Sequence, residues 1–173
     1  MKKMMSPNTR IDWIPVAGLT GLPVLKATQL NAGQNISAAI VKGFTLGATD
    51  SGVDTSSTIV DEGTVETQTD ENYEGKLNFF RDAIGTGTQL APEAATAFTT
   101  AFNLFKAPHT EGYLVSRHGK KATEPYAAGD VVSVFRFKND HLKELEGDDS
   151  GPMQIEVEFF PQGEMVLNRT VVA

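Results

Sequence analysis

Few residues of this 173-residue chain have the types and spacing that chemistry requires. The three histidines, His109, His118 and His141, are not spaced as paired metal ligands, which commonly stand one helical turn apart. We interpret them as surface side chains. Cysteine is absent, which excludes disulfides, thiolate metal sites and a cysteine nucleophile. The chain also has no Gly-x-Ser-x-Gly motif and no glycine-rich phosphate loop before a helix. The sequence therefore predicts no enzyme, no cofactor and no bound metal.

Carboxylates are the remaining candidates for a site. Four acids lie in a segment rich in glycine, serine and threonine: Asp50, Asp54, Asp61 and Glu62. Their spacing does not match the twelve-residue calcium loop, so we interpret them as solvated loop charge. Glu156 and Glu158 have the residue types of an acid–base pair. Alternation along one strand would place them side by side on a wet face, which is the commoner arrangement.

The composition indicates one globular domain. Hydrophobic residues make up 40% and charged residues 21%, and the formal net charge is −7. This acidity argues against non-specific binding of DNA or RNA, which needs clustered lysine and arginine. No apolar run follows the two lysines at the start, so we expect no signal peptide. No run of about 18 apolar residues occurs, so we expect no membrane span.

Most of the chain alternates between polar and apolar residues with a period of two, which is typical of half-buried strands. The pattern is clearest over residues 64–80, where every even position from 64 to 78 is polar. Val65, Tyr73, Leu77 and Phe79 stand at odd positions. Further strands are predicted over residues 10–19, 24–29, 35–42, 112–117, 131–138, 154–160 and 164–172.

One segment, residues 90–106, has the spacing of a helix instead. Phe98, Phe102 and Phe105 lie on one helical face, and we expect this face to pack on a sheet. Pro92 suits a first helical turn and Pro108 the end of the helix. The predicted fold class is therefore mainly β: a two-sheet sandwich or barrel with one flanking α-helix, spanning residues 10–173.

Two stretches do not fit a compact domain. Residues 47–63 form a polar loop of unusual length, and residues 1–9 form a polar N-terminal arm without a pattern. Either both segments become ordered against a neighbouring subunit, or both are flexible. The residues alone leave the two interpretations open.

Several blocks together resemble the major tail tube proteins of bacteriophages with long, non-contractile tails. They are GFTLGATDSG at 43–52, DEG at 61–63, NYEGKLNFFRD at 72–82, GYLVSRHGKKATEPYAAGDVVSVFRF at 112–137 and FFPQGEMVLN at 159–168. The blocks span most of the chain in a consistent order. They are most similar to tail proteins of phages that infect actinobacteria.

The resemblance implies a structural virion protein whose hexameric rings stack into a tube that conducts the genome to the host cell. One sheet of each subunit would join its neighbours in a continuous inner β-barrel. The loop at 47–63, with Asp50, Asp54, Asp61 and Glu62, and the N-terminal arm would bridge rings. Other tail proteins would cap the ends, DNA would pass without specific binding, and synthesis would occur in the host cytoplasm.

Under this resemblance, the acids on wet strand faces become candidates for the lining of the tube. The first set is Glu66, Asp70 and Glu74, and the second is Glu156 and Glu158. Acids facing the bore would repel phosphates. Lys76 stands on the same polar face as the first set and weakens that assignment. The acids could instead solvate the tube's exterior.

Two other functions stay open on the sequence. A tail-completion or tail-tip protein of related fold would form a single ring. A carbohydrate-binding sandwich would present exposed aromatic residues for stacking on sugars. Trp13, Tyr73, Tyr113 and Tyr126 are too scattered to favour that module.

Overall fold

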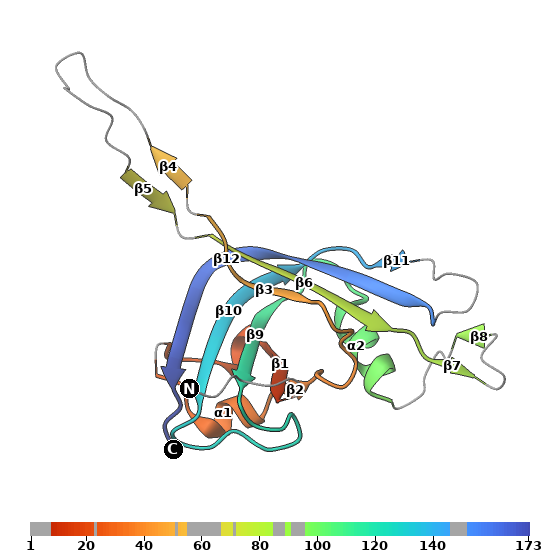
Figure 1. Cartoon of the computed structure of the whole chain (residues 1–173), viewed down its shortest axis with the longest axis horizontal. Helices are drawn as coiled ribbons and strands as arrows, with labels where there is room; N and C mark the ends of the chain where they lie inside the picture. Colours follow the sequence, from red (N-terminus) through yellow and green to blue (C-terminus); the bar gives the residue numbers. More distant parts are fainter. Residues whose placement is uncertain are drawn as a thin grey trace, which may run out of the picture.

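The computed structural model describes residues 8–22, 24–50, 52–54, 67–70, 72–84, 89–90, 96–145 and 152–173. Most of the expected N-terminal arm and much of the expected loop at 47–63 lie outside these ranges. The described part of the chain is mainly β, as predicted, and its central element is one antiparallel sheet of eight strands in the order β2-β1-β9-β10-β12-β6-β3, with β11 beside β12 (Figure 1).

The bounds of the eight strands are as follows: β1 Thr9–Pro15, β2 Gln34–Asn35, β3 Thr45–Ala48, β6 Tyr73–Phe80, β9 Glu111–His118, β10 Val131–Asn139, β11 Lys143–Leu145 and β12 Gln154–Thr170. Two small hairpins stand apart from this sheet. One pairs β4 (Gly52–Asp54) with β5 (Thr67–Asp70), and the other pairs β7 (Ala83–Ile84) with β8 (Gln89–Leu90).

Strand β12 makes the sheet fold over on itself. Its first part pairs with β6 up to Phe159, and from Phe159 onward it pairs with β10. Two register shifts interrupt the β10 pairing, and bulges of this kind bend a strand and increase its twist. The expected two layers are therefore two halves of one continuous sheet, with β3, β6 and β11 in one half and β1, β9 and β10 in the other (Figure 1).

The flanking helix, α2, spans Ala97–Phe105 and is shorter than the predicted 90–106. Its N-cap is Thr96, whose Oγ1 accepts a hydrogen bond from the Thr99 N–H at 3.3 Å. Leu90 belongs to strand β8, and residues 91–95, including Pro92 and Glu93, lie outside the described residues. A 3-10 turn, η1 (Val16–Gly18), and a short helix, α1 (Ala27–Asn31), complete the described elements.

Two of the predicted strands are wrong. Residues 24–29 enter α1, since Lys26 makes a single bridge to Val172 and helix follows directly. Residues 35–42 contain only the end of β2, a turn and an isolated bridge from Ile40 to Phe79. Residues 16–18 of the predicted first strand form η1 instead.

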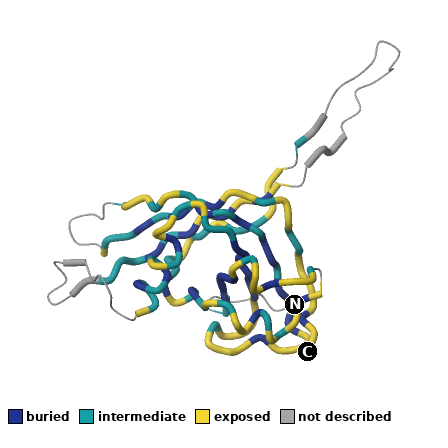
Figure 2. Tube along the Cα trace, turned by 180° about the vertical axis from the view of Figure 1, so that it is seen from behind, coloured by how far each residue is buried: buried dark blue, intermediate teal, exposed yellow. Residues whose placement is uncertain are grey.

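The halves of the sheet enclose an aromatic core. Phe105 of α2 packs edge-on against Trp13 and Phe159, with ring centroids 5.1 and 5.3 Å apart, and it stacks on Phe79 at 5.6 Å. A second core, which includes Leu25, Leu30 and Val132, covers the other face of β9 and β10 beneath α1. Strands β9 and β10 consequently run buried for most of their length (Figure 2).

Candidate functional site

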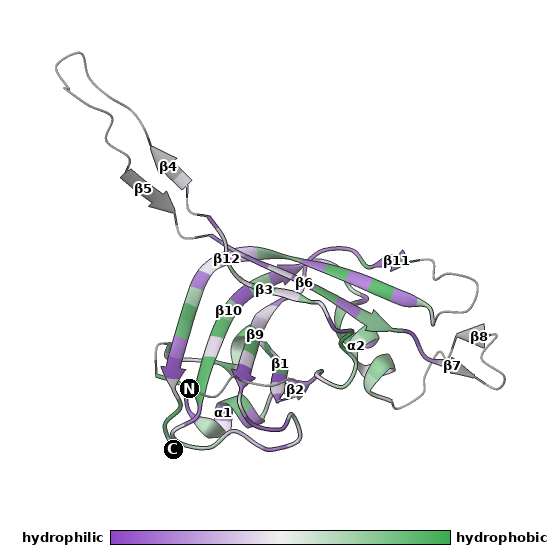
Figure 3. Ribbon diagram, viewed as in Figure 1, coloured by the Kyte–Doolittle hydropathy of each residue, from purple (hydrophilic) through white to green (hydrophobic). Residues whose placement is uncertain are grey.

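One face of the sheet remains open where β6, β11 and the first part of β12 lie together. Along β6, Tyr73, Leu77 and Phe79 point into the core and the even positions point away from it. Along β12, Ile155 and Val157 are buried and their neighbours are only partly covered. This period of two appears as alternating hydropathy bands on β12 (Figure 3). We call this outer surface the charged face; it is defined by Glu74, Lys76, Lys143, Glu156 and Glu158.

Two lysines and two glutamates form a connected network on the charged face. Lys76 Nζ lies 2.7 Å from Glu156 Oε2 and 3.7 Å from Glu158 Oε1. Lys143 Nζ lies 2.9 Å from Glu158 Oε2 and 3.9 Å from Glu156 Oε1. The register explains the contacts, because Lys143 stands opposite Glu156 and Lys76 stands opposite Glu158. Each lysine therefore has two carboxylates within reach.

The titration of the network follows these contacts. The hydrogen bond to Glu156 raises the pKa of Lys76, and the hydrogen bond to Glu158 raises the pKa of Lys143. The hydrogen bond from Lys143 in turn lowers the pKa of Glu158. Both lysines thus stay charged and engaged with carboxylates near neutral pH.

The same surface continues onto β9 and β10. Arg136 Nη2 lies 3.3 Å from Glu111 Oε2, and Arg136 Nη1 lies 3.2 Å from Glu164 Oε1. The Tyr113 hydroxyl donates to Glu164 Oε2 at 2.9 Å. Burial, together with this hydrogen bond, raises the pKa of Tyr113. Charged groups on this part of the face are again paired with groups of opposite sign.

Phe160 interrupts the polar surface. It stands opposite Lys138 across the β10–β12 pair and is 49% exposed. Lys138 makes no ion pair within the described part of the chain. The outer surface of the sheet is thus mainly charged, with one exposed aromatic ring.

The curvature that separates this face from the rest of the sheet depends on Tyr73. Its hydroxyl donates to the Arg136 carbonyl oxygen at 2.6 Å and accepts from the N–H groups of Gln162 and Glu164 at 3.0 and 3.2 Å. Gly163, between those two donors, has a φ of 79°, which glycine adopts without strain. Tyr73 therefore satisfies the backbone at the point where β12 leaves β6.

The structure brings some of the predicted lining acids together. Glu156 and Glu158 share the network described above, and Glu74 lies on the same face of β6 as Lys76, exposed and without an ion pair to another described residue. Asp70 is in β5, but only its backbone is described. Glu66 lies outside the described residues.

The four acids assigned to the loop at 47–63 are less well defined. Asp50 is exposed, and its carbonyl oxygen accepts from Asn72 Nδ2 at 3.3 Å. Asp54 belongs to β4, again with only its backbone described. Asp61 and Glu62 lie outside the described residues. The loop begins as strand β3 and continues into the β4–β5 hairpin, which is more regular structure than its composition predicts.

The three helix phenylalanines occupy different depths. Phe105 is fully buried, whereas Phe98 and Phe102 pack against the core while partly exposed. Phe98 meets Phe80 edge-on at 6.0 Å between ring centroids. The Arg81 guanidinium carbon lies 3.7 Å from the centre of the Phe102 ring, within cation–π range.

Sequence reasoning missed Lys143 as a member of the charged face. The residue lies outside every predicted strand, because a strand of three residues gives no periodic signal. Among the described residues, no group of three or more metal-capable side chains occurs. No described helix is long and apolar enough to span a membrane.

These features define a class of protein: a mainly β subunit with a curved antiparallel sheet, a flanking helix, an open charged face and a hairpin outside the sheet. The solved structure of the SPP1 tail tube shares this fold, with a TM-score of 0.52 and 9% sequence identity over 98% of this chain and 81% of that chain. No curated protein matches the sequence.

The sequence model of the family described as "Phage tail tube protein" matches residues 1–173. The chain belongs to this phage tail tube protein family, as its sequence blocks predicted. It is a structural protein of the tail tube, and its place is in the tail of the virion.

Proposed function

We propose that six copies of this chain close into a ring, that rings stack into the tube, and that the charged face lines the bore through which DNA passes. The observation that carries the proposal is the open outer surface of β6, β11 and β12 with its paired lysines and glutamates. An assembled tube in which this surface does not face the bore would overturn the proposal.

Burial supports this choice of face. Strands β9 and β10 have a core on each side over most of their length, so they offer little open surface. The outer side of β6 and of the first part of β12 is covered by no other described element. A surface that must meet water inside a tube is expected to be open and polar in the isolated subunit.

Strand direction supports a continuous barrel. In this half of the sheet the order is β3-β6-β12-β11, and every neighbouring pair is antiparallel. The two outer strands, β3 and β11, are therefore antiparallel to each other. If β11 of one copy pairs with β3 of the next, the alternation continues without a break around the ring.

The strand count also fits a conduit. Six copies with four strands each would close a barrel of about 24 strands, more than the 16–18 strands of porins, which already enclose an aqueous channel. Closure would remove the free edges of β3 and β11, which are otherwise templates for uncontrolled strand pairing.

The charges explain how DNA would pass without being held. With its continuation onto β9 and β10, the face carries five glutamates (Glu74, Glu111, Glu156, Glu158 and Glu164) against four cations (Lys76, Lys138, Lys143 and Arg136). Asp140 adds a further carboxylate that acts on Lys143 and Glu158. Three of the four cations already contact carboxylates. A phosphate would have to displace a neighbouring glutamate to gain each contact, so binding stays weak.

In this proposal, segments outside the charged face make the contacts between rings. The β4–β5 hairpin pairs beyond the ends of β3 and β6, away from the rest of the sheet (Figure 1). We assign residues 47–63, with the N-terminal arm 1–9, to bridging successive rings. Other tail proteins meet the ends of the tube, and the chain is made in the host cytoplasm.

Electron cryo-microscopy of tubes assembled from purified protein tests the proposal. We expect stacked rings of six copies with Glu156 and Lys76 facing the bore. A ring with these side chains on its outer surface, or single rings that never stack, would contradict it.

A further inference from the structure

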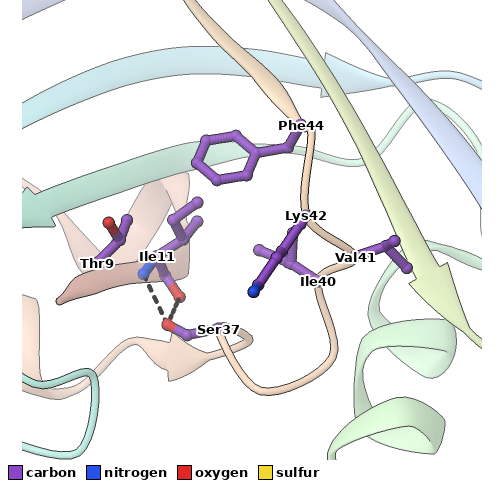
Figure 4. Close-up of a pocket in the computed structure, with 7 residues that line it drawn as sticks. All are labelled: Thr9, Ile11, Ser37, Ile40, Val41, Lys42 and Phe44. Atoms are coloured by element: carbon purple, nitrogen blue, oxygen red, sulfur yellow. Dashed lines mark hydrogen bonds between the residues drawn. The ribbon is translucent and has the colours of Figure 1, made fainter. Parts of the chain in front are cut away.

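A pocket of about 180 Å3 opens beside the free edge of β3. Thr9 and Ile11 of β1 line one side, and Ile40, Lys42 and Phe44, from the segment that leads into β3, line the other (Figure 4). Most of the lining is apolar. Lys42 is the one charged residue among the residues that line it.

The polar groups of the pocket other than Lys42 have partners inside the chain. Ser37 Oγ accepts from the Ile11 N–H at 2.7 Å and donates to the Ile11 carbonyl oxygen at 3.2 Å. Lys42 is exposed and makes no ion pair within the described part of the chain. The pocket therefore offers an apolar wall and one unpaired ammonium group.

A matching carboxylate lies at the opposite edge of the same half-sheet. Glu144 of β11 stands opposite the buried Ile155, so it leaves the strand on the side of the core. Leu142, two residues earlier, packs against that core. Glu144 is nevertheless exposed, and it too makes no ion pair within the described residues. A charge that points inward on an edge strand keeps that edge from pairing at random.

We propose that Glu144 of one copy docks at the Thr9–Phe44 pocket of the next copy and pairs with its Lys42. The inference rests on the β11–β3 contact of the proposed function. It adds that Lys42 and Glu144 favour this contact between copies over other strand pairings. Leu46 of β3 packs against the core, as Phe44 does, so the core side of β3 is also the side of the pocket. A neighbour's β11, added antiparallel to β3, brings Glu144 to this side, within the reach of a long side chain.

This pair would also dictate how copies join. Two β11 edges paired antiparallel about their middle residue would oppose Glu144 to Glu144. That like-edge contact is repulsive, whereas the β11–β3 contact is attractive. A contact between unlike edges is the kind that closes rings.

Charge reversal tests the pairing. We expect Lys42→Glu and Glu144→Lys each to reduce the yield of tubes at least tenfold, because each creates a like-charge contact at every junction. The double variant Lys42→Glu/Glu144→Lys should restore the yield. Lys106→Glu and Glu124→Lys make the same changes in net charge at other exposed positions and should assemble like the unmodified chain. Far-ultraviolet circular dichroism and thermal unfolding establish that every variant is folded.

Mixing the two single variants gives a stricter test. In a 1:1 mixture, a ring that alternates Lys42→Glu copies with Glu144→Lys copies has an attractive pair at every junction. We expect the mixture to give tubes at the yield of the unmodified chain, against the at least tenfold lower yield of either variant alone. This rescue requires an even number of copies in the ring.

Covalent cross-linking reads out the contact directly, because the chain has no cysteine of its own. Lys42→Cys/Glu144→Cys, treated with a short bismaleimide after assembly, should give a ladder of covalent oligomers that ends at the ring size. Lys106→Cys/Glu144→Cys is the matched control and should stay monomeric in a denaturing gel.

The outcomes separate this inference from the proposed function. Normal assembly of both single variants, or folded double variants that stay as defective as the singles, would overturn the Lys42–Glu144 pair. Tubes with the charged face in the bore would still support the proposed function in either case. Tubes whose copies meet through other edges would overturn both.

Discussion

Lys76 Nζ and Glu156 Oε2 lie 2.7 Å apart across the β6–β12 pair, and Glu156 is the better covered of the two side chains, at 13% exposed against 46%. The glutamate therefore holds the lysine at the surface of the sheet. Lys143 approaches the same carboxylate from the other side at 3.9 Å. Lys76 and Lys143 thus lie on the charged face without being free cations.

Neutralising the two glutamates should make the bore retain DNA. Glu156→Gln/Glu158→Gln frees Lys76 and Lys143 in every copy, and each freed cation adds a salt-sensitive phosphate contact. We expect tubes of normal length but slower genome release, with the delay shrinking as salt is raised. Release kinetics from virions measure this, and Glu124→Gln is the control away from the face. Unchanged release from normal tubes would remove Glu156 and Glu158 from the lining.

Removing the Tyr73 hydroxyl should destabilise the bend in β12. Tyr73→Phe leaves the Arg136 carbonyl and the N–H groups of Gln162 and Glu164 without their partner. Burial raises the pKa of Tyr73, so the hydroxyl is protonated at neutral pH. We expect the free energy of unfolding to fall by about 1–3 kcal/mol, the usual cost of unpaired buried polar groups. Urea denaturation measures it, and Tyr113→Phe, which loses a single bond, should cost less.

The sequence pattern predicted the strands that have one covered and one open face. Polar residues alternate with Tyr73, Leu77 and Phe79 over residues 73–79, with Gly75 as the exception, and β6 is found there. Residues 24–29 were misassigned because Val24 and Leu25 suggest a strand, whereas Leu30, buried in the second core, stabilises α1. Tertiary packing decided that segment, and no local pattern encodes it.

The same limit explains the two features of β12 that the sequence did not reveal. The sequence predicts two strands, residues 154–160 and 164–172, yet β12 is continuous. The hydroxyl of Tyr73, some 90 residues earlier, binds the irregular backbone between them. Lys143 reaches the charged face only through the register of β11 on β12. Cross-strand partners distant in sequence leave no periodic trace.

Acid should weaken the ion pairs of Asp130 with Arg117 and Lys120, which anchor the loop between β9 and β10. Burial alone would raise the pKa of Asp130, but hydrogen bonds from Lys120, the Ala127 N–H and Arg117 outweigh it and lower the pKa below 3.8. The folded state therefore binds this proton less readily than the unfolded chain. The stabilisation that ionised Asp130 gives the folded state is complete above about pH 4. It is lost as the pH falls through the folded-state pKa of Asp130.

Asp130→Asn tests that anchor. Arg117, 1% exposed, would keep its charge but lose its carboxylate, and breaking a buried pair in this way costs about 3–5 kcal/mol. We expect a lower free energy of unfolding at pH 7 and a flatter acid dependence below pH 4 than in the unmodified chain. Chemical denaturation across pH measures both, with Asp140→Asn, at a partly exposed position without an ion pair to another described residue, as the control. An equal acid slope in the two variants would show that Asp130 is not the titrating group.

The antiparallel pair of β1 and β9 should tolerate no added methyl group at Gly112. A Cβ there would lie 2.6 Å from Trp13 Cε2 and 2.8 Å from the Ile14 carbonyl oxygen, so backbone as well as side chain would have to move. We expect Gly112→Ala to lower the free energy of unfolding by about 1–3 kcal/mol, the range for overpacked cores. Gly47→Ala is the matched control within the same sheet, since a Cβ at Gly47 meets nothing within 4 Å. Denaturation midpoints of the two variants compare them, and equal midpoints would contradict the close approach of Trp13 to the β9 backbone.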